Sequence, residues 1–180
     1  MGTSARSLLT VVGLITVAPA GAATLIVDRT DHAPQASACT DAPLDCSLTG
    51  AIDLANTSTG PDIVVLTADT FRLENTGAVP VIRSDITVNG VGRDQTLVAA
   101  AITYRSAAFD IRAGGSLKLQ DMTVTGFTNI TGGAVVVSGE ANARAELQRV
   151  MVTSSRVMSW ERESRCNRRP APPSQPSDSG

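Results

Sequence analysis

The chain has few of the residues from which catalytic and metal sites are usually built. Its 180 residues include one histidine, His32, one lysine, Lys118, and five residues of the types Phe, Tyr and Trp. A lone histidine without supporting motifs excludes a Ser-His-Asp triad. Cys39, Cys46 and the lone histidine also provide too few ligands for a zinc site in the loop that contains the two cysteines. The formal net charge of −2 leaves no basic face for nucleic acid or anionic lipid. We therefore expect no cofactor, no metal and no nucleic-acid partner.

A short strand motif, in contrast, occurs three times. It reads SDITVNG at 84–90, QDMTVTG at 120–126 and QRVMVTS at 148–154, so the copies begin 36 and 28 residues apart. Apolar and small polar residues alternate within each copy, which is typical of a β-strand. A repeat of roughly 20 to 50 residues is typical of stacked architectures, because one unit cannot bury its own apolar face.

Further strands are predicted between the motif copies, at 108–111 and 117–119 and again at 134–137 and 145–147. Glycines separate them, and no helical pattern intervenes. Three short strands per unit predict an all-β fold, a right-handed parallel β-helix, which is a solenoid of stacked coils. The alternative is an antiparallel sandwich, which favours two-residue Asn-Gly or Asp-Gly hairpins. Asn89-Gly90 is the only such pair, and it ends a motif copy.

Residues 1–23 have the pattern of a secretory signal peptide. Arg6 is the only charged residue, an apolar run extends from Leu8 to Val17, and small residues at 18–22 fit a cleavage site. The apolar run is shorter than the roughly 20 residues that a membrane-spanning helix needs. The chain is therefore predicted to be exported, secreted or held at the cell surface, without a transmembrane segment.

Residues 24–61 are predicted to precede the coils. They begin with a strand at 24–31, followed by a polar loop that contains Cys39 and Cys46. Two cysteines seven residues apart in an exported chain are expected to form a local disulfide. His32 is expected to be a solvent-exposed loop residue.

A short amphipathic helix is predicted at 47–56. Apolar residues recur there at helical spacing, and Ser47 is a suitable N-cap. The predicted coils follow at 62–156. A helix in this place would cap the first coil, whose apolar side chains and unpaired strand edges would otherwise promote aggregation.

Three pieces of this region carry a resemblance to a known family: Cys39, the run CSLTGAIDLAN at 46–56 and the run GPDIVVL at 60–66. Together they resemble the N-terminal region of CSLREA-domain proteins, which are bacterial, exported, right-handed parallel β-helix repeat proteins. The similarity covers residues 24 to about 155, and the coils within it are generic to many β-helices. It implies a surface or secreted role, often adhesin-like, with no catalytic residues to carry over.

The chain departs from the family pattern inside the helix. Where the family has Cys-Ser-Leu-Arg-Glu-Ala-Ile, Thr49 and Gly50 replace the charged pair. A glycine inside a helix costs up to about 1 kcal/mol relative to a better helix former. The helix is therefore expected to be weaker than the family pattern implies.

Residues 157–180 differ from the rest of the chain. A charged run is followed by a Pro/Ser-rich stretch without any period. Such a segment cannot bury a core and is predicted to be disordered. Because the strand pattern stops without a capping pattern, truncation or a change of reading frame after residue 156 is the alternative. Cys166 has no predicted role.

Asp85 and Asp121 are the sharpest candidate ligand residues. Superposing the motif copies gives Asp85, Asp121 and Arg149 one equivalent position, so the two carboxylates are expected to face each other on adjacent coils, about 4.8 Å apart. Paired carboxylates bind Ca²⁺ or act as an acid/base pair on polysaccharides. An aspartate just before a strand is also an ordinary turn residue.

Tyr104 is the remaining candidate, as a contact for a sugar. Aromatic faces stack on the apolar side of sugar rings, and Tyr104 lies next to Arg105 in a predicted loop. Phe109 and Phe127 fall in or beside strands and are expected in the core.

Two functions are consistent with the sequence. The first is a non-catalytic, exported β-helix that acts as an adhesin-like or structural surface module, with an extracellular glycan or cell-surface component as its partner. The alternative is a polysaccharide-active lyase or hydrolase, or the remnant of one. Few aromatic residues and no assembled carboxylate cluster favour the first, and the fold alone does not decide.

Overall fold

The structure, a computed structural model, describes residues 21–74, 79–102, 104–127, 133–139 and 141–153, together with the backbone of 157–159. Most of the predicted signal peptide and the segment 160–180, with Cys166, lie outside the described residues. Within them the chain forms thirteen strands and one helix. In chain order these are β1 (Thr24–Val27), α1 (Leu48–Ala55), β2 (Asp62–Leu66), β3 (Thr70–Leu73), β4 (Val81–Ile82), β5 (Asp85–Asn89), β6 (Leu97–Ala100), β7 (Phe109–Ile111), β8 (Ser116–Gln120), β9 (Thr123–Thr125), β10 (Val135–Val137), β11 (Arg144–Gln148), β12 (Met151–Thr153) and β13 (Val157–Ser159).

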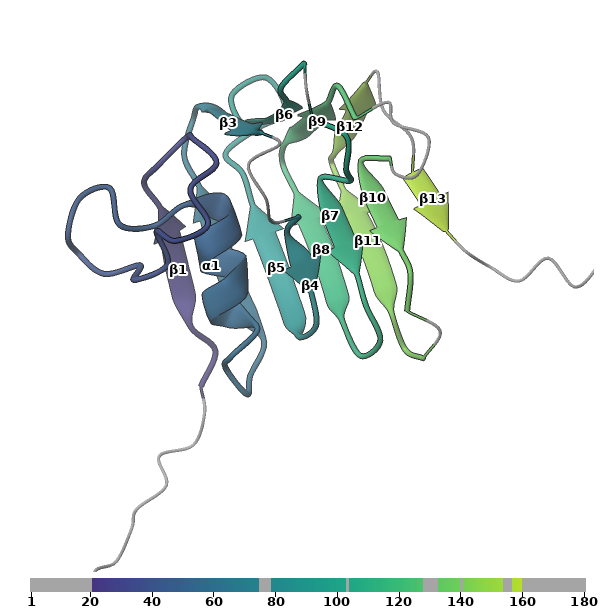
Figure 1. Cartoon of the computed structure of the whole chain (residues 1–180), viewed down its shortest axis with the longest axis horizontal. Helices are drawn as coiled ribbons and strands as arrows, with labels where there is room; N and C mark the ends of the chain where they lie inside the picture. The colour runs from purple at the N-terminus through teal and green to yellow at the C-terminus, as the bar shows by residue number, and fades with distance from the viewer. Residues whose placement is uncertain are drawn as a thin grey trace, which may run out of the picture.

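The strands form three parallel sheets, which the chain visits in a fixed order (Figure 1). Sheet 1 has the order β1-β2-β5-β8-β11, sheet 2 has the order β3-β6-β9-β12, and sheet 3 has the order β4-β7-β10-β13. From β2 onward each circuit of the chain adds one strand to sheet 1, then one to sheet 2 and one to sheet 3. This arrangement confirms the prediction of an all-β chain of parallel strands with one short helix.

Alternating side chains of each strand fill the space between the sheets. In sheet 1, Ile86 lies beside Leu117 and Val88 lies beside Leu119, and all four side chains are buried. The residues between them face outward and are half-buried. Each fully buried aliphatic side chain contributes about 1.5–3 kcal/mol relative to an exposed one, so this inner layer is the main source of stability.

The predicted register of the first motif copy is wrong. The copies at 120–126 and 148–154 do superpose, because Val124 in β9 lies beside Val152 in β12. The copy at 84–90 instead forms β5 in sheet 1, where it pairs with β8 and not with β9. The circuits differ in length: the outward positions Ile63, Thr87, Lys118 and Glu146 are aligned although they are 24, 31 and 28 residues apart.

The predicted boundary at residue 157 is also wrong. Val157–Ser159 form β13, which continues sheet 3 by pairing with β10 in parallel. The strand pattern therefore extends at least three residues into the segment that composition had marked as disordered.

Helix α1 begins where the sequence predicts. Ser47 is its N-cap, and the Gly50 N–H donates to the Ser47 hydroxyl at 3.0 Å. The helix packs against β1, β2 and β4, in the place that later circuits fill with a strand of sheet 3 (Figure 1). The C-cap residue Asn56 hydrogen-bonds to β4 in place of a neighbouring strand. Its side-chain amide donates to the carbonyl of Val81 at 2.6 Å and accepts from the N–H of Arg83 at 2.8 Å. One side chain thus makes two of the hydrogen bonds that a neighbouring strand would make with β4.

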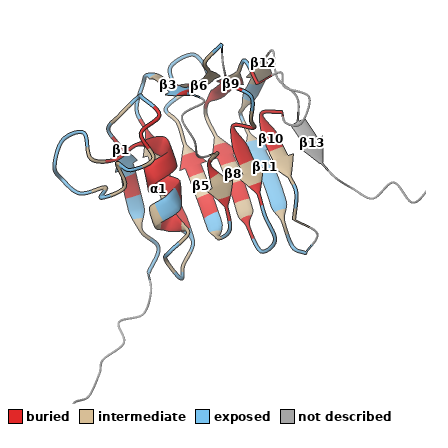
Figure 2. Ribbon diagram, viewed as in Figure 1, coloured by how far each residue is buried: buried red, intermediate tan, exposed pale blue. Residues whose placement is uncertain are grey.

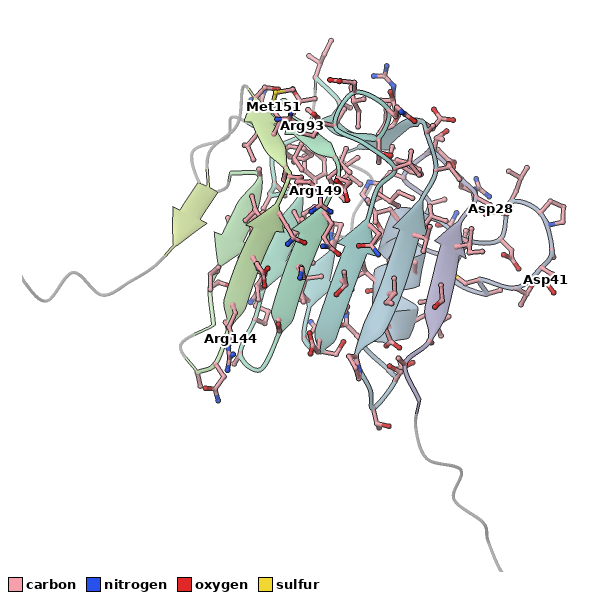
Figure 3. The ribbon with its side chains drawn as sticks, turned by 180° about the vertical axis from the view of Figure 1, so that it is seen from behind. Asp28, Asp41, Arg93, Arg144, Arg149 and Met151 are labelled. Carbon is pink, nitrogen blue, oxygen red and sulfur yellow. A yellow bond between two sulfur atoms is a disulfide. The ribbon has the colours of Figure 1, made fainter. Side chains whose placement is uncertain are left out.

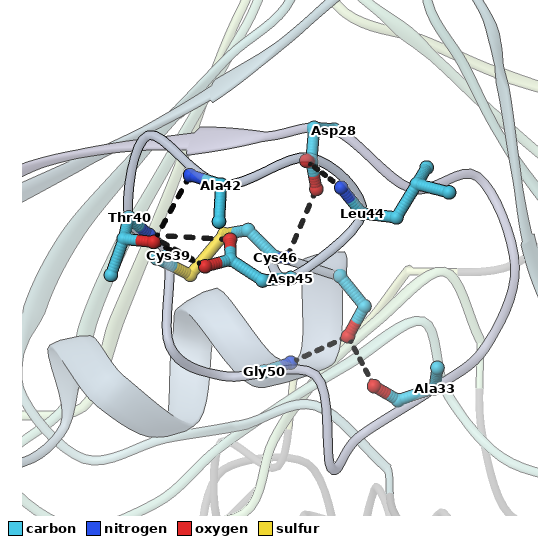
Figure 4. The surroundings of a disulfide bond; sticks show 10 residues. Asp28, Ala33, Cys39, Thr40, Ala42, Leu44, Asp45, Cys46 and Gly50 are labelled. Carbon is cyan, nitrogen blue, oxygen red and sulfur yellow. Dashed lines mark hydrogen bonds between the residues drawn. A yellow bond between two sulfur atoms is a disulfide. The ribbon is translucent and has the colours of Figure 1, made fainter.

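A disulfide-closed loop lies beside the helix (Figure 4). It joins Cys39 to Cys46. The carboxylate of Asp28 accepts from the backbone N–H groups of Cys46, at 3.0 Å, and of Leu44. Desolvation alone would raise the pKa of Asp28, but these N–H donors together lower it below its usual range. The loop is therefore fixed by an ionised carboxylate as well as by the disulfide.

The opposite end of the sheets is less well covered. The inward position of β11 that follows Leu119 in register is Leu147, whose exposed fraction is 37%, compared with 1% for Leu119. Figure 2 shows the change in colour between the red inner positions of β8 and the pale blue of β11. Among the described residues, the apolar layer is thus closed at the α1 end and open at the β11 end.

Candidate functional site

The outward face of sheet 1 is polar over β5, β8 and β11 (Figure 3). Two rows of side chains cross it from strand to strand. One row consists of Asp85, Ser116 and Arg144, and the next consists of Thr87, Lys118 and Glu146. Because strands of one sheet lie about 4.8 Å apart, neighbours in a row are within reach of a single ligand.

These two rows line an open trough of about 520 Å³. Its lining consists of Asp85, Thr87, Ser116, Leu117, Lys118, Arg144, Ala145 and Glu146. Two cations, two carboxylates and two hydroxyls therefore project from three adjacent strands, with no aromatic side chain among them. Sites built on strands hold their groups more precisely than sites on loops, so we take the trough as the candidate site.

One ion pair organises the centre of the trough. Lys118 Nζ lies 3.4 Å from Glu146 Oε1, across from β8 to β11. Both side chains are partly exposed, and exposed ion pairs contribute about 0–1 kcal/mol. The pair is therefore weak enough to open when a ligand offers either group a better partner.

The predicted Asp85–Asp121 pair does not form. Asp85 begins β5 and lies in the trough, with Ser116 as its neighbour in register. Asp121 lies at the bend after β8, outside the lining of the trough. The two aspartates are not equivalent because the first motif copy belongs to sheet 1.

Asp121 instead pairs with Arg149, the residue that superposition correctly made its equivalent. Arg149 Nε and an Nη atom each lie 2.6 Å from one carboxylate oxygen of Asp121. This bidentate contact, more than the opposing desolvation, lowers the pKa of Asp121. Both residues have a φ of 53°, so they form the same left-handed bend in successive circuits. Asp121 is a bend residue with a salt bridge, not a ligand residue of the trough.

Tyr104 is buried and does not present a face to a sugar. Its ring packs edge-on against Phe127, with centroids 5.6 Å apart, and against His32 at 6.3 Å. Its hydroxyl donates to the carbonyl of Ala107 at 2.7 Å. The prediction of an exposed His32 is also wrong, because this residue is buried and its Nδ1 lies 2.5 Å from the carbonyl oxygen and 3.0 Å from the backbone nitrogen of Glu74. Together these rings fill the core near sheet 2.

Burial gives Tyr104 a measurable titration. Desolvation strongly raises the pKa of its phenol, so above about pH 10, where an unfolded tyrosine ionises, the folded chain binds more protons than the unfolded chain. The free energy of unfolding should therefore fall as the pH rises above about 10. Tyr104 is the only tyrosine, so the near-ultraviolet absorbance of phenolate reports on it alone.

We expect no phenolate signal until the protein unfolds, as followed by circular dichroism in the same titration. The variant Tyr104→Phe should lose less stability over the same alkaline range. A phenolate signal that develops near pH 10 in the folded protein would contradict the burial of Tyr104.

Sequence reasoning found Asp85 but missed the other charged residues of the trough. Lys118, Arg144 and Glu146 all occupy outward positions of strands that the sequence placed correctly, so the signal was the alternation within each strand. The sequence does not reveal the register between strands, and this register places the three residues on one surface with Asp85.

Comparison with known proteins assigns the chain to no family. No family model matches the chain, and a search of curated proteins finds no match. Within the described residues, no helix is long and apolar enough to cross a membrane. The same part of the chain contains no group of three or more His, Cys, Asp and Glu residues that could hold a metal ion.

Proposed function

We propose that this chain is an exported, non-catalytic repeat protein of the CSLREA type whose three sheets form a right-handed parallel β-helix. The fixed order of visits to the three sheets supports the stacked coils. Crossover connections between parallel strands of one sheet are right-handed in nearly all proteins, which supports the hand. The apolar run at 8–17 and the disulfide loop support export.

We further propose an adhesin-like role in which the trough binds an acidic extracellular glycan. The observation that carries this proposal is the alternation of cations, carboxylates and hydroxyls over three rigid strands. Lys118 and Arg144 suit the carboxylate of an acidic sugar. Asp85 and Glu146 suit the hydroxyls of the ring, which donate to carboxylates. A volume of about 520 Å³ is in the range of small-ligand sites and accommodates a short segment of a polysaccharide.

The test is binding to acidic and neutral polysaccharides by isothermal titration calorimetry. We expect polygalacturonate or hyaluronate to bind and dextran, which is neutral, not to bind. Lys118→Gln removes the central cation, and loss of one charge-assisted hydrogen bond of about 1.5–3 kcal/mol should weaken binding at least tenfold. The matched control is Arg93→Gln, because Arg93 is exposed and lies far from the trough (Figure 3).

Two results would count against this function. Equal binding by wild type and Lys118→Gln would remove the trough as the site, and no binding to any acidic polysaccharide would leave a purely structural role. A second candidate, a polysaccharide-cleaving enzyme, is favoured by one observation, namely that Asp85 and Glu146 line the same trough. New chain ends released from the polysaccharide, and lost in Asp85→Asn, would support the enzyme.

A further inference from the structure

The open end of the sheets presents both apolar side chains and an unpaired strand edge. Strand β11 pairs with β8 on one side and is the last strand of sheet 1 among the described residues. Its inward positions Ala145 and Leu147 continue the columns of Leu117 and Leu119, yet both are exposed. Met151, in the adjacent β12, is 38% exposed. Residues that would be core residues in an inner circuit are therefore exposed at this end.

The other end is largely occupied at sheets 2 and 3. Helix α1 covers the first circuit, and Asn56 occupies the carbonyl of Val81 and the N–H of Arg83 at the edge of β4. The edge of β3 is partly occupied too, because the N–H of Arg72 donates to the carbonyl of Thr30 at 2.8 Å. Head-to-tail stacking of copies, which would give open-ended fibres, would therefore have the edge of β1 as its main pairing edge. Contact between two open ends instead covers the exposed inward side chains of both copies.

We propose that this chain forms a two-fold symmetric dimer in which β11 pairs antiparallel with β11 of a second copy. Such an interface is closed, since each copy uses its one open end. It pairs the backbone edge and covers the inward side chains Ala145 and Leu147. Exposed edges of this kind are otherwise sites of aggregation.

The charges of β11 select one register. When the two-fold axis passes through Ala145, Arg144 of each copy lies opposite Glu146 of the other, and inward residues stay opposite inward residues. Centring on Glu146 or on Arg144 instead places like charges opposite each other, which is destabilising. Centring on Leu147 pairs neither charge with its opposite. The axis at Ala145 is therefore the favoured arrangement, and Lys118 extends it because it already contacts Glu146.

The same register joins the two outward faces. Antiparallel pairing about an axis perpendicular to the sheet keeps both outer surfaces on one side, so the two copies of sheet 1 become continuous. This geometry follows from the position of β11 and holds whether or not the trough binds a glycan.

Sedimentation velocity of the full exported chain, from micromolar to millimolar concentration, tests the dimer. We expect a concentration-dependent shift to twice the monomer mass. Arg144→Glu places carboxylates opposite each other at both symmetric positions, and we expect it to weaken the dimer about tenfold or more. Glu146→Lys places cations opposite each other and should act similarly.

Mixing the two variants separates the register from general effects. In the mixed pair, the carboxylate introduced by Arg144→Glu would lie opposite the ammonium introduced by Glu146→Lys, and the unchanged Glu146 of one copy would lie opposite the unchanged Arg144 of the other. A heterodimer should therefore form where neither variant alone dimerises. Arg93→Glu is the matched charge reversal away from β11, and circular dichroism checks that every variant is folded.

Three outcomes overturn the dimer. The first is a wild type that stays monomeric at all concentrations, as expected if another segment of the chain covers β11. The second is a dimer that is insensitive to Arg144→Glu. The third is a pair of folded single variants that fail to rescue each other when they are mixed.

Discussion

Gly50→Ala is expected to lower the free energy of unfolding by about 1–3 kcal/mol, the range of an overpacked core site, although alanine is the better helix former. A Cβ at Gly50 would lie 2.0 Å from the carbonyl oxygen of Ala36 and 2.6 Å from its carbonyl carbon. That oxygen cannot move away freely, because it accepts from the N–H of Ser47 at 2.9 Å. The steric cost therefore outweighs the gain of up to about 1 kcal/mol in helix propensity. Urea denaturation measures the difference.

Asp53→Ala is the matched control for Gly50→Ala. Asp53 is an exposed residue of the same helix, so the change to alanine raises helix propensity without a clash, and we expect an effect within about 0.5 kcal/mol. If Gly50→Ala were as stable as the wild type or more so, the close approach of the Ala36 backbone to α1 would be wrong.

Leu119→Ala is expected to cost about 3 kcal/mol, as large-to-small changes in a packed core usually do. Leu119 is 1% exposed and lies at an inward position of β8 in sheet 1. Leu147 provides an internal comparison, since it is the same residue type in the next position of the same column. Because Leu147 is 37% exposed, Leu147→Ala should cost less than about 1 kcal/mol by the area it loses.

Both variants are measured by urea denaturation at low protein concentration, where the proposed dimer is dissociated. The same experiment at high concentration should raise the cost of Leu147→Ala, because the dimer covers this side chain. Equal costs for Leu119→Ala and Leu147→Ala at low concentration would mean that the end of the sheets is already covered within one chain.

The sequence is most informative where the signal is local. Helix α1 was predicted from its N-cap Ser47 and the spacing of its apolar residues, and most strands were predicted from alternation. These patterns involve residues within one turn or one strand, so no knowledge of distant segments is needed.

Long-range register is where sequence reasoning fails. The motif copy at 84–90 matches the copy at 120–126 in residue type, yet the two belong to different sheets because the circuits differ in length. His32 and Tyr104 are buried for the same reason: each meets partners from distant parts of the chain, such as Glu74 and Phe127. Gly50 departs from the family pattern, and only the contact with Ala36 explains why a glycine fits there.

The pairing of strands also sets the order in which the chain can fold. Paired residues in adjacent strands are 22 to 39 positions apart in the sequence, from Val135 with Val157 to Thr24 with Ile63, and no two of the described strands form a hairpin. Such non-local contacts make for slow folding. The only helix in the described part of the chain is α1, which precedes the coils in the sequence together with its disulfide loop. Each later circuit then arrives at an edge that the previous circuit has already built, so folding can proceed by addition, one circuit at a time, in the direction of synthesis.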